Sequence, residues 1–314
     1  MNPGTYFHQP VLLKEVLEFL EPKTGETVID ATLGGGGYSL AVLEKIGKNG
    51  TLLSVDLDHD AISNAHSLVG EKKNWILVQG NFRNIDKIAE KHKLNQINGI
   101  VADIGFSSYE LDGSGRGFAF QKNEPLDMRF DQGQPEDARF YLANKSAEEL
   151  EKIFREYGEE KFSRQIARKI KEMENEGRKI RHTGELLQAI EAALPKPVKH
   201  KASDSARRIF QALRIAVNHE LENLKDFLPK AFDLLSSGGR MAVVSFHSLE
   251  DREVKTYFNN LVKGCVCPPD FPQCLCGRKP KAKILSKKPI TASEAELSAN
   301  SRSRPAKLRG LIKL

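Results

Sequence analysis

Short apolar runs alternate with segments of helical periodicity over the first third of this 314-residue chain. The runs are rich in Val, Ile and Leu, which is typical of strands buried inside a sheet. The alternation predicts a parallel sheet with helices on both faces, and ligands of such sheets bind beyond the carboxyl ends of the strands. The expected strands are residues 26–32, 51–58, 74–82 and 97–106, and the expected helices are residues 11–20 and 39–47.

A charged helical region interrupts this pattern. Residues 107–135 are rich in Gly, Asp and Arg, and residues 146–194 have helical periodicity with many charges. Ser146 and Glu149 have the spacing of a capping box, and Pro195 is placed to end the last helix of this region. The region is therefore expected to fold as a separate helical unit.

The sheet pattern resumes after the helical region, with a helical stretch over 206–235, a predicted strand over 238–246 and a predicted helix over 249–262. We therefore expect a sheet domain made of residues 1–110 and 205–314. A mainly helical subdomain for substrate recognition, residues 111–204, is inserted into it.

The segment DATLGGGGYS, residues 30–39, places four consecutive glycines after an apolar run. Glycines lose much entropy on folding, so such a run indicates that the backbone passes close to a ligand. A phosphate-binding P-loop ends in Gly-Lys-Ser/Thr, and the absence of any lysine before Lys45 argues strongly against one. A dinucleotide loop is incomplete here, because Ser39 occupies the position of its third glycine.

The pattern favours S-adenosylmethionine over a dinucleotide. Proteins that bind it have an acid after the first strand, a glycine loop, and an acid after the second strand that binds the ribose hydroxyls. Asp30 and Asp56 occupy these positions, with Asp58 and Asp60 as alternatives to Asp56. The dinucleotide fold also has the second acid, so both hypotheses stay open at this point. The expected cofactor loop is Gly34, Gly35, Gly36 and Gly37.

Asp103 follows the fourth predicted strand, in VADIGFSS. An exocyclic amine of a nucleobase is a poor nucleophile because its lone pair is delocalised into the ring. An enzyme can supply a hydrogen-bond acceptor for this amine and hold it in line with a methyl donor. Asp103 is therefore a candidate catalytic residue, with cofactor binding or capping of the loop as its alternatives.

A series of longer motifs runs along almost the whole chain. In order, they are HQPVLLKEV, DATLGGGGYS, DIGFSSYELD, RGFAF, PLDMRF, FQALRIAVNHEL, SFHSLEDREVK, KKPI and SRSRPAKLR. Together these motifs resemble the RsmH (MraW) family of methyltransferases. The resemblance implies a Rossmann-like α/β fold of class I S-adenosylmethionine-dependent methyltransferases, with a helical insertion. It also implies methylation of N4 of a cytidine in the decoding region of 16S rRNA, the RNA of the small ribosomal subunit.

The resemblance also places cofactor contacts, and two of them depart from the family pattern. Tyr38 stands where the family commonly has histidine, and Glu110 stands where it commonly has glutamine. A glutamate accepts hydrogen bonds but cannot donate them as an amide does. The detailed contacts at these two positions are therefore expected to differ. The implied cofactor contacts are Gly36, Gly37, Tyr38, Asp56, Phe82, Asp103 and Glu110, with Phe82 suited to stacking on adenine.

Further polar residues inside these motifs are candidates for the substrate side. Each could line the cytidine pocket or brace a loop. His247 has the chemistry of a general base, but loss of a proton after methylation at N4 does not require one. The candidates are Arg116, Asp127, Arg129, Asn218, Ser245 and His247.

All four cysteines of the chain lie in CVCPPDFPQCLC: Cys265, Cys267, Cys274 and Cys276. Two Cys-x-Cys pairs in a reducing compartment are consistent with a structural zinc site made of thiolates. Zinc ribbons usually have two residues between paired cysteines, so free or oxidisable thiols remain an alternative.

Basic charge gathers at the C-terminal end of the chain. Residues 278–314 contain eleven lysines and arginines but only two acidic residues, so this segment has a formal charge of +9. Residues 1–277 have a formal charge of −3, which gives the net charge of +6 for the chain. A local basic region is typical of polyanion binding. We expect this segment and the loop 196–208 to contact RNA phosphates.

The remaining expectations concern location and competing substrates. No stretch is long and apolar enough to span a bilayer, and the first residues lack the pattern of a signal peptide, so we expect a cytoplasmic protein without a membrane partner. DNA-directed amine methyltransferases usually carry a Pro-Pro-aromatic motif where this chain has DIGFSS, so no DNA substrate is expected. The alternatives are another nucleic-acid amine or an inactive RNA-binding assembly factor, against which the intact Asp30, Asp56 and Asp103 argue.

Overall fold

The computed structural model of the chain describes residues 10–69, 72–105, 114–265, 267, 273 and 275–314. The chain forms two compact units, which are described one at a time. The first unit consists of residues 1–105 and 221–314, and the second unit of residues 106–220.

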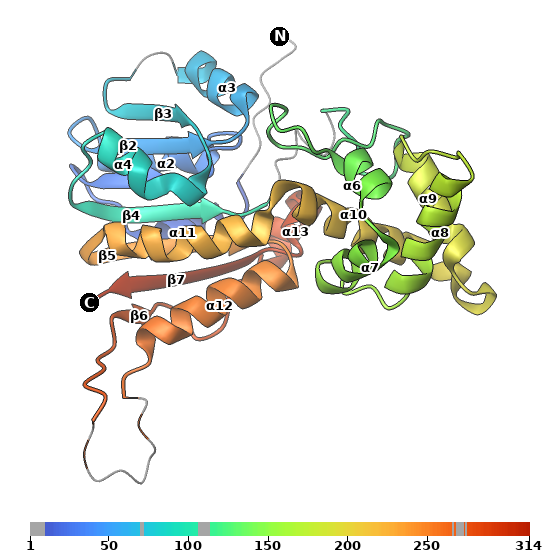
Figure 1. The fold of residues 1–314 in the computed structure, drawn as a ribbon. Helices are drawn as coiled ribbons and strands as arrows, with labels where there is room; N and C mark the ends of the chain where they lie inside the picture. The colour runs from blue at the N-terminus through green and yellow to red at the C-terminus, as the bar shows by residue number, and fades with distance from the viewer. Residues whose placement is uncertain (1–9, 70–71, 106–113, 266, 268–272, 274) are drawn as a thin grey trace. The chain divides into compact units, whose positions relative to one another are not determined.

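The first unit is built on a seven-stranded sheet with the order β3-β2-β1-β4-β5-β7-β6 (Figure 1). Strands β1 to β5 pair parallel with one another, while β7 runs antiparallel to both β5 and β6. This is the Rossmann-like α/β architecture that the alternating pattern predicts. The strands are β1 Thr27–Asp30, β2 Thr51–Asp56, β3 Trp75–Gln79, β4 Ile97–Asp103, β5 Leu235–Ser245, β6 Ala282–Ile284 and β7 Lys307–Lys313.

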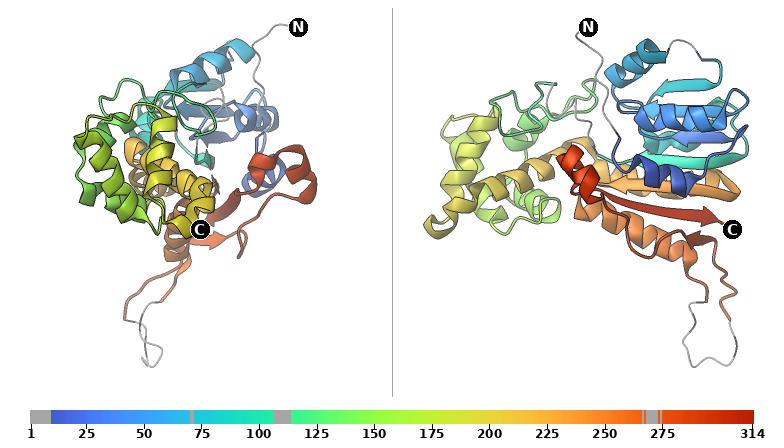
Figure 2. Two further views of the ribbon diagram at one scale, coloured as in Figure 1. Left: turned by 90° about the vertical axis from the view of Figure 1, so that its right-hand side faces the viewer. Right: turned by 180° about the vertical axis from the view of Figure 1, so that it is seen from behind.

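Helices cover both faces of this sheet (Figure 2). Neighbouring residues of β1 point to opposite faces, so Val28 packs with α1, α2 and α3 while Ile29 packs with α4, α11 and α12. Both side chains are fully buried, as expected for a parallel sheet covered on both sides. The helices are α1 Leu13–Leu20, α2 Gly37–Ile46, α3 His59–Val69, α4 Ile85–Lys91, α11 Glu220–Leu234, α12 Ser248–Val262 and α13 Glu294–Ala299, with the 3₁₀ turns η1 Phe82–Asn84 and η3 Ser301–Ser303.

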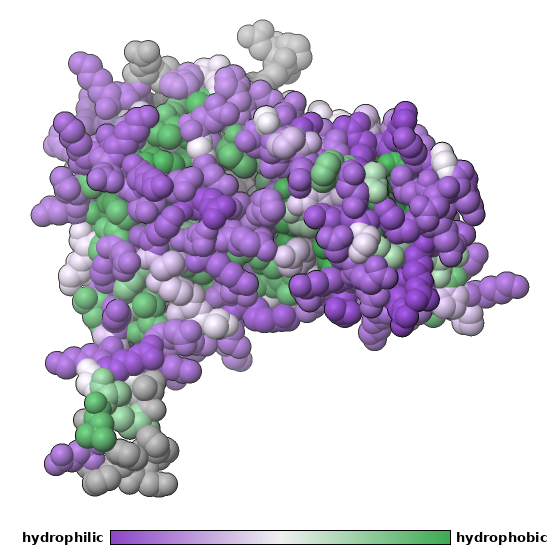
Figure 3. Space-filling view, in the orientation of Figure 1, coloured by the Kyte–Doolittle hydropathy of each residue, from purple (hydrophilic) through white to green (hydrophobic). Residues whose placement is uncertain are grey.

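The second unit is helical and has its own hydrophobic core. The capping box predicted from Ser146 and Glu149 is confirmed at the start of α7. Hydrophilic side chains cover most of the face of this unit that Figure 3 presents. Its helices are α6 Ala138–Asn144, α7 Ala147–Glu156, α8 Ser163–Asn175, α9 Thr183–Ala193 and α10 Ala202–Asn218, with the 3₁₀ turn η2 Lys196–Lys201.

The helical character predicted for residues 206–235 is confirmed, and the structure divides this stretch into two helices. His219 adopts a left-handed conformation, with φ of 52°, and separates α10 from α11. The apolar face of α10, including Phe210 and Leu213, belongs to the core of the second unit. That unit therefore extends past the predicted end at residue 204, to Glu220.

The basic C-terminal segment contains two strands, β6 and β7, that the sequence analysis did not predict. Their basic residues serve partly as structural groups. Nζ of Lys313 donates to the carbonyl oxygens of Phe232, Asp233 and Leu235 at the end of α11, at 3.0, 3.1 and 2.6 Å. A cation at this end of a helix also interacts favourably with the helix dipole. No described helix combines the length and the apolar character needed to cross a membrane.

Candidate active site

Three aspartates end neighbouring strands at one edge of the sheet of the first unit. Asp30 is the last residue of β1, Asp56 of β2 and Asp103 of β4, and β1 lies between the other two strands (Figure 1). Parallel strands bring their carboxyl ends to the same edge, so the structure places these predicted residues side by side. The backbone N–H of Asp103 donates to Oγ1 of Thr32 at 2.6 Å, which ties the end of β4 to the loop after β1.

The glycine loop between β1 and α2 needs glycine for two different reasons. Gly34 and Gly36 have φ of 50° and 77°, a region that side chains with a Cβ rarely adopt. Gly37 has an ordinary φ, but a Cβ there would lie 2.7 Å from Cδ of Pro10. A Cβ on Gly34 would meet nothing within 4 Å, so the loop has open space on that side.

Asp56 anchors this loop. Its Oδ2 accepts a hydrogen bond from the N–H of Gly34 at 2.7 Å, and its Oδ1 accepts one from the N–H of Asp58 at 2.9 Å. Burial raises the pKa of Asp56 to about 6, although these two hydrogen bonds act to lower it. Each carboxylate oxygen retains a further lone pair, which a hydroxyl group could use.

Asp30 and Asp103 have the more strongly raised pKa values. Burial raises the pKa of Asp30 to about 7, although hydrogen bonds from the Ser39 hydroxyl and the Thr32 N–H oppose this. Burial, followed by the nearby charges of Asp30 and Glu250, raises the pKa of Asp103 to about 8. Oδ1 of Asp103 is buried and has no hydrogen-bond partner among the described residues. Buried, unpartnered carboxylate oxygens are costly and occur mostly at functional sites.

Two further predicted cofactor residues pack into the first unit. The side chain of Tyr38 is buried in the core, and its hydroxyl donates to the carbonyl oxygen of Val11. Burial raises the pKa of this hydroxyl well above its usual value. Phe82 packs edge-on against Phe227, with ring centroids 5.1 Å apart. The cofactor roles of both residues stay predictions, and Glu110 lies outside the described residues.

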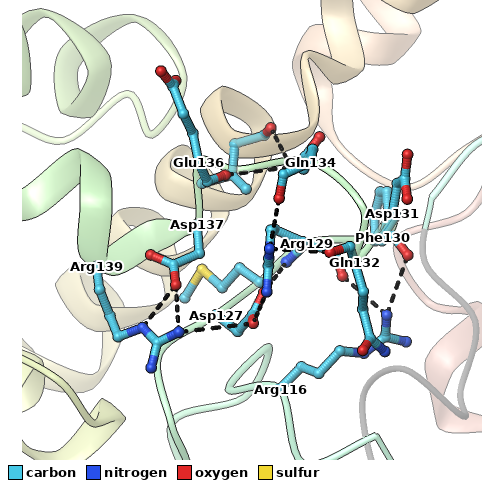
Figure 4. Close-up of polar contacts among 12 residues, drawn as sticks. Arg116, Asp127, Arg129, Phe130, Asp131, Gln132, Gln134, Glu136, Asp137 and Arg139 are labelled. Carbon is cyan, nitrogen blue, oxygen red and sulfur yellow. Dashed lines mark hydrogen bonds and ion pairs between the residues drawn. The ribbon is translucent and has the colours of Figure 1, made fainter.

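Three of the predicted substrate residues, Arg116, Asp127 and Arg129, lie together in a loop of the second unit (Figure 4), and a fourth, Asn218 at the end of α10, bonds to the same loop. Asp127 and Arg129 form a two-bonded ion pair, with both nitrogen–oxygen distances 2.7 Å. Nη1 of Arg116 donates to the carbonyl oxygens of Arg129 and Phe130. Asn218 accepts from the N–H of Phe130 at 2.8 Å and donates to the carbonyl oxygen of Met128 at 2.7 Å. These contacts brace the loop.

Burial alone would raise the pKa of Asp127, but the hydrogen bonds and charge of Arg129, and then the charge of Arg139, lower it below its usual value. Asp127 is therefore held as a carboxylate within this loop. A role of the four residues in binding a substrate stays a prediction.

Ser245 is the last residue of β5 in the first unit, and His247 follows this strand. The hydroxyl of Ser245 donates to the carbonyl oxygen of Lys307 on β7 at 3.4 Å. His247 caps α12, because its Nδ1 accepts from the N–H of Glu250 at 3.4 Å. Both side chains thus have structural contacts at this strand end, and their substrate roles stay predictions.

Three of the four cysteines are described, and they lie together. Cys265, Cys267 and Cys276 have sulfur atoms within 4.8 Å of one another, and the sulfurs of Cys265 and Cys276 are 3.7 Å apart. Cys274 lies outside the described residues. Hydrophobic side chains are exposed on the segment between α12 and β6 that carries these cysteines (Figure 3), and Leu275 is 74% exposed.

A family model described as the MraW methylase family matches residues 5–314, nearly the full chain. The chain belongs to this methylase family. The resemblance found in the sequence motifs is thereby confirmed, and with it the fold class of the sheet domain.

Relatives of this methylase carry one name. The protein named Ribosomal RNA small subunit methyltransferase H from Clostridium botulinum (strain 657 / Type Ba4) is 45% identical over 302 residues, covering 96% of this chain and 97% of its own. The protein of the same name from Heliobacterium modesticaldum is 44% identical over 314 residues, covering 98% of this chain and 99% of its own.

The structure adds residues to the site of this methylase that the sequence analysis missed. Thr32, Ser39 and Glu250 contact or influence the strand-end aspartates. Ser39 had a visible signal, because it lies in the first turn after the glycine run. Glu250 had none, since its proximity to Asp103 depends on the packing of α12.

Proposed function

We propose that this protein transfers a methyl group from S-adenosylmethionine to N4 of a cytidine in the decoding region of 16S rRNA. The proposal is carried by the buried, unpartnered Oδ1 of Asp103 beside an open glycine loop. Membership of the methylase family and the shared name of the relatives support the substrate class.

The residues at this edge fit the cofactor. The loop of Gly34 and Gly36 offers backbone with open space beside it, and Asp56 has lone pairs for the ribose hydroxyls. Phe82 would stack on the adenine, and Glu110 and the backbone of Tyr38 complete the proposed contacts. The cofactor, when bound, supplies an electrophilic methyl group on a positively charged sulfur.

Asp103 would act on the attacking amine. A carboxylate that accepts an N–H of the amine orients its lone pair toward the methyl group and stabilises the positive charge that develops on nitrogen. A cation nearby lowers the pKa of a carboxyl group, so a positively charged cofactor would favour the charged form of Asp103. Binding of the cofactor's own amino group is the alternative role of the same oxygen.

The second unit would recognise the RNA. Lys196, Lys199 and Lys201 on η2 are exposed basic residues, suited to phosphate contacts that do not depend on sequence. In the C-terminal segment Arg309 is held by Asp251 at 2.6 Å, so the exposed Lys287 and Lys288 are better placed for phosphates. Specificity would come from RNA shape and an unstacked cytidine.

The test is labelling of small ribosomal subunits taken from a strain that lacks this methylation. The protein is incubated with them and with S-adenosylmethionine carrying a labelled methyl group, and the RNA is then digested to nucleosides. Label in N4-methylcytidine is expected. Asp103→Asn should lower turnover at least 100-fold, within the range of general acid–base contributions. The control Glu90→Gln, an exposed carboxylate on α4, should retain full turnover.

Each competing hypothesis has its own outcome in this experiment. Label in DNA, in protein, or at a carbon or ribose position would contradict the proposal. Binding of the cofactor by calorimetry without label in any nucleic acid would indicate an inactive RNA-binding assembly factor. In vivo, a cytoplasmic location follows from the proposed substrate.

We also propose that the cysteine cluster holds a structural zinc ion. Three thiols this close can supply three of the four ligands of a tetrahedral site, with Cys274 as the fourth. Metal analysis of protein purified without chelator should find about one zinc per chain, and Cys265→Ser should abolish it. Absence of zinc together with four titratable thiols would contradict this site.

A further inference from the structure

A buried chain of hydrogen bonds runs from β3, the outermost strand of the sheet, to Asp30 at the end of β1. Nε1 of Trp75 on β3 donates to Oγ of Ser54 at 2.8 Å, and Oγ of Ser54 lies 2.7 Å from Oγ of Ser39. The hydroxyl of Ser39 donates to Oδ2 of Asp30 at 2.6 Å. All four residues are buried, and Trp75 is the most exposed of them at 8%.

The hydrogen bonds of this chain are all satisfied when Asp30 is ionised. An indole N–H can only donate, so Ser54 accepts from Trp75. A hydroxyl oxygen can accept twice, so the direction of the bond between Ser54 and Ser39 is set from the Asp30 end. Ser39 gives its single hydrogen to the ionised Oδ2 of Asp30, and Ser54 then donates to Ser39. If Oδ2 of Asp30 carried a proton and donated it to Ser39, the hydroxyl hydrogen of either Ser39 or Ser54 would have no acceptor among the four residues.

We propose that Ser39, Ser54 and Trp75 are positioning residues that keep Asp30 ionised beneath the glycine loop, so that the site prefers a cationic ligand over a neutral one. This inference rests on the proposed function, because the methyl donor carries a positive sulfur and its demethylated product does not. Weaker binding of the uncharged product than of the cationic methyl donor lets the product leave while the donor is retained.

Other groups near Asp30 oppose its ionisation. Asp56 on β2 and Asp103 on β4 are both acidic, and burial works in the same direction. Tyr38 on α2 lies close enough to interact electrostatically with Asp30 and is neutral. The bonds from Ser39 and from the N–H of Thr32 oppose these effects. Without the chain, Asp30 would be protonated over a wider pH range.

The experiment measures ligand binding by calorimetry between pH 6 and pH 9, for S-adenosylmethionine and for S-adenosylhomocysteine. Ser39→Ala removes a hydrogen bond to a charged group, which is expected to raise the pKa of Asp30 by about one unit. The pH midpoint for binding the cationic ligand should rise by the same amount. At pH 7 the preference for the cationic over the neutral ligand should fall about three- to tenfold.

Ser54→Ala and Trp75→Phe should produce smaller shifts in the same direction, because each removes a bond farther from Asp30. The control Ser67→Ala, an exposed serine on α3, should leave both the midpoint and the preference unchanged. Carboxyl NMR of the ligand-free proteins gives the pKa of Asp30 directly. If Ser39→Ala fails to fold, Ser54→Ala gives the decisive comparison.

The outcomes separate this inference from the proposed function. A wild-type protein that binds neither ligand would refute the proposed cofactor but leave the NMR comparison valid. An unchanged pKa of Asp30 in folded Ser39→Ala or Ser54→Ala would overturn the positioning role, whatever the enzyme methylates. Equal losses of affinity for the two ligands would also overturn it, because they would indicate general damage to the loop.

Discussion

Replacement of Asp103 with asparagine should change how the stability of the first unit depends on pH. The folded protein holds the pKa of Asp103 at about 8, against 3.8 for an ordinary aspartate. Between these values the folded state keeps a proton that the unfolded state releases, so stability is greatest at low pH and falls as pH rises. Asparagine has no proton to release, so the variant loses this dependence.

The size of the effect follows from proton linkage. One proton difference between the two states gives a slope of about 1.4 kcal/mol per pH unit. Between pH 5 and pH 7 the free energy of unfolding of wild type should therefore fall by about 3 kcal/mol more than that of the variant. Asp30 titrates in both proteins, and Asp103 of wild type is mostly protonated and uncharged between pH 5 and pH 7, so the difference between the two proteins arises mainly from position 103.

The assay is urea unfolding of cofactor-free protein at pH 5, 6 and 7. Trp75 is the single tryptophan of the chain and lies in the first unit, so its fluorescence follows that unit. The exposed-carboxylate control Glu90→Gln should differ from wild type by less than about 0.5 kcal/mol at each pH. A difference between wild type and Asp103→Asn that stays constant from pH 5 to pH 7 would refute the linkage argument.

Three further changes test other parts of the molecule. Gly37→Ala brings a Cβ against Pro10 and should destabilise the first unit by about 1–3 kcal/mol in urea unfolding, and an unchanged midpoint would contradict the contact. Lys313→Met removes three bonds to the end of α11 and should cost about 1–2 kcal/mol in the same assay, whereas no loss would show the bonds to be unimportant. Replacing the three lysines of η2 with glutamine should weaken RNA binding and lower its salt slope by about two in filter-binding titrations; an unchanged slope would place the phosphate contacts elsewhere.

The parallel sheet could be predicted from the sequence because each of its strands has a local sequence pattern. The runs that end at Asp30, Asp56 and Asp103 are apolar and short, and their order along the chain fixes which strand ends meet at one edge. The break at His219 could not be predicted this way. Residues 206–235 keep an apolar helical face on both sides of the break, and only the two separate cores show that the face changes its packing partner.

The candidate site likewise has one part that the sequence predicts and another part that only the tertiary structure shows. The glycine run and the strand-end aspartates are determined by sequence, since backbone conformation and chain order depend on neighbouring residues. The chain from Trp75 to Asp30 was decided by tertiary structure alone, because it joins three strands and one helix whose members are up to 45 residues apart in sequence. Hydrogen-bond direction depends on which donors and acceptors are brought within reach, and that is a property of the packed sheet rather than of any local pattern.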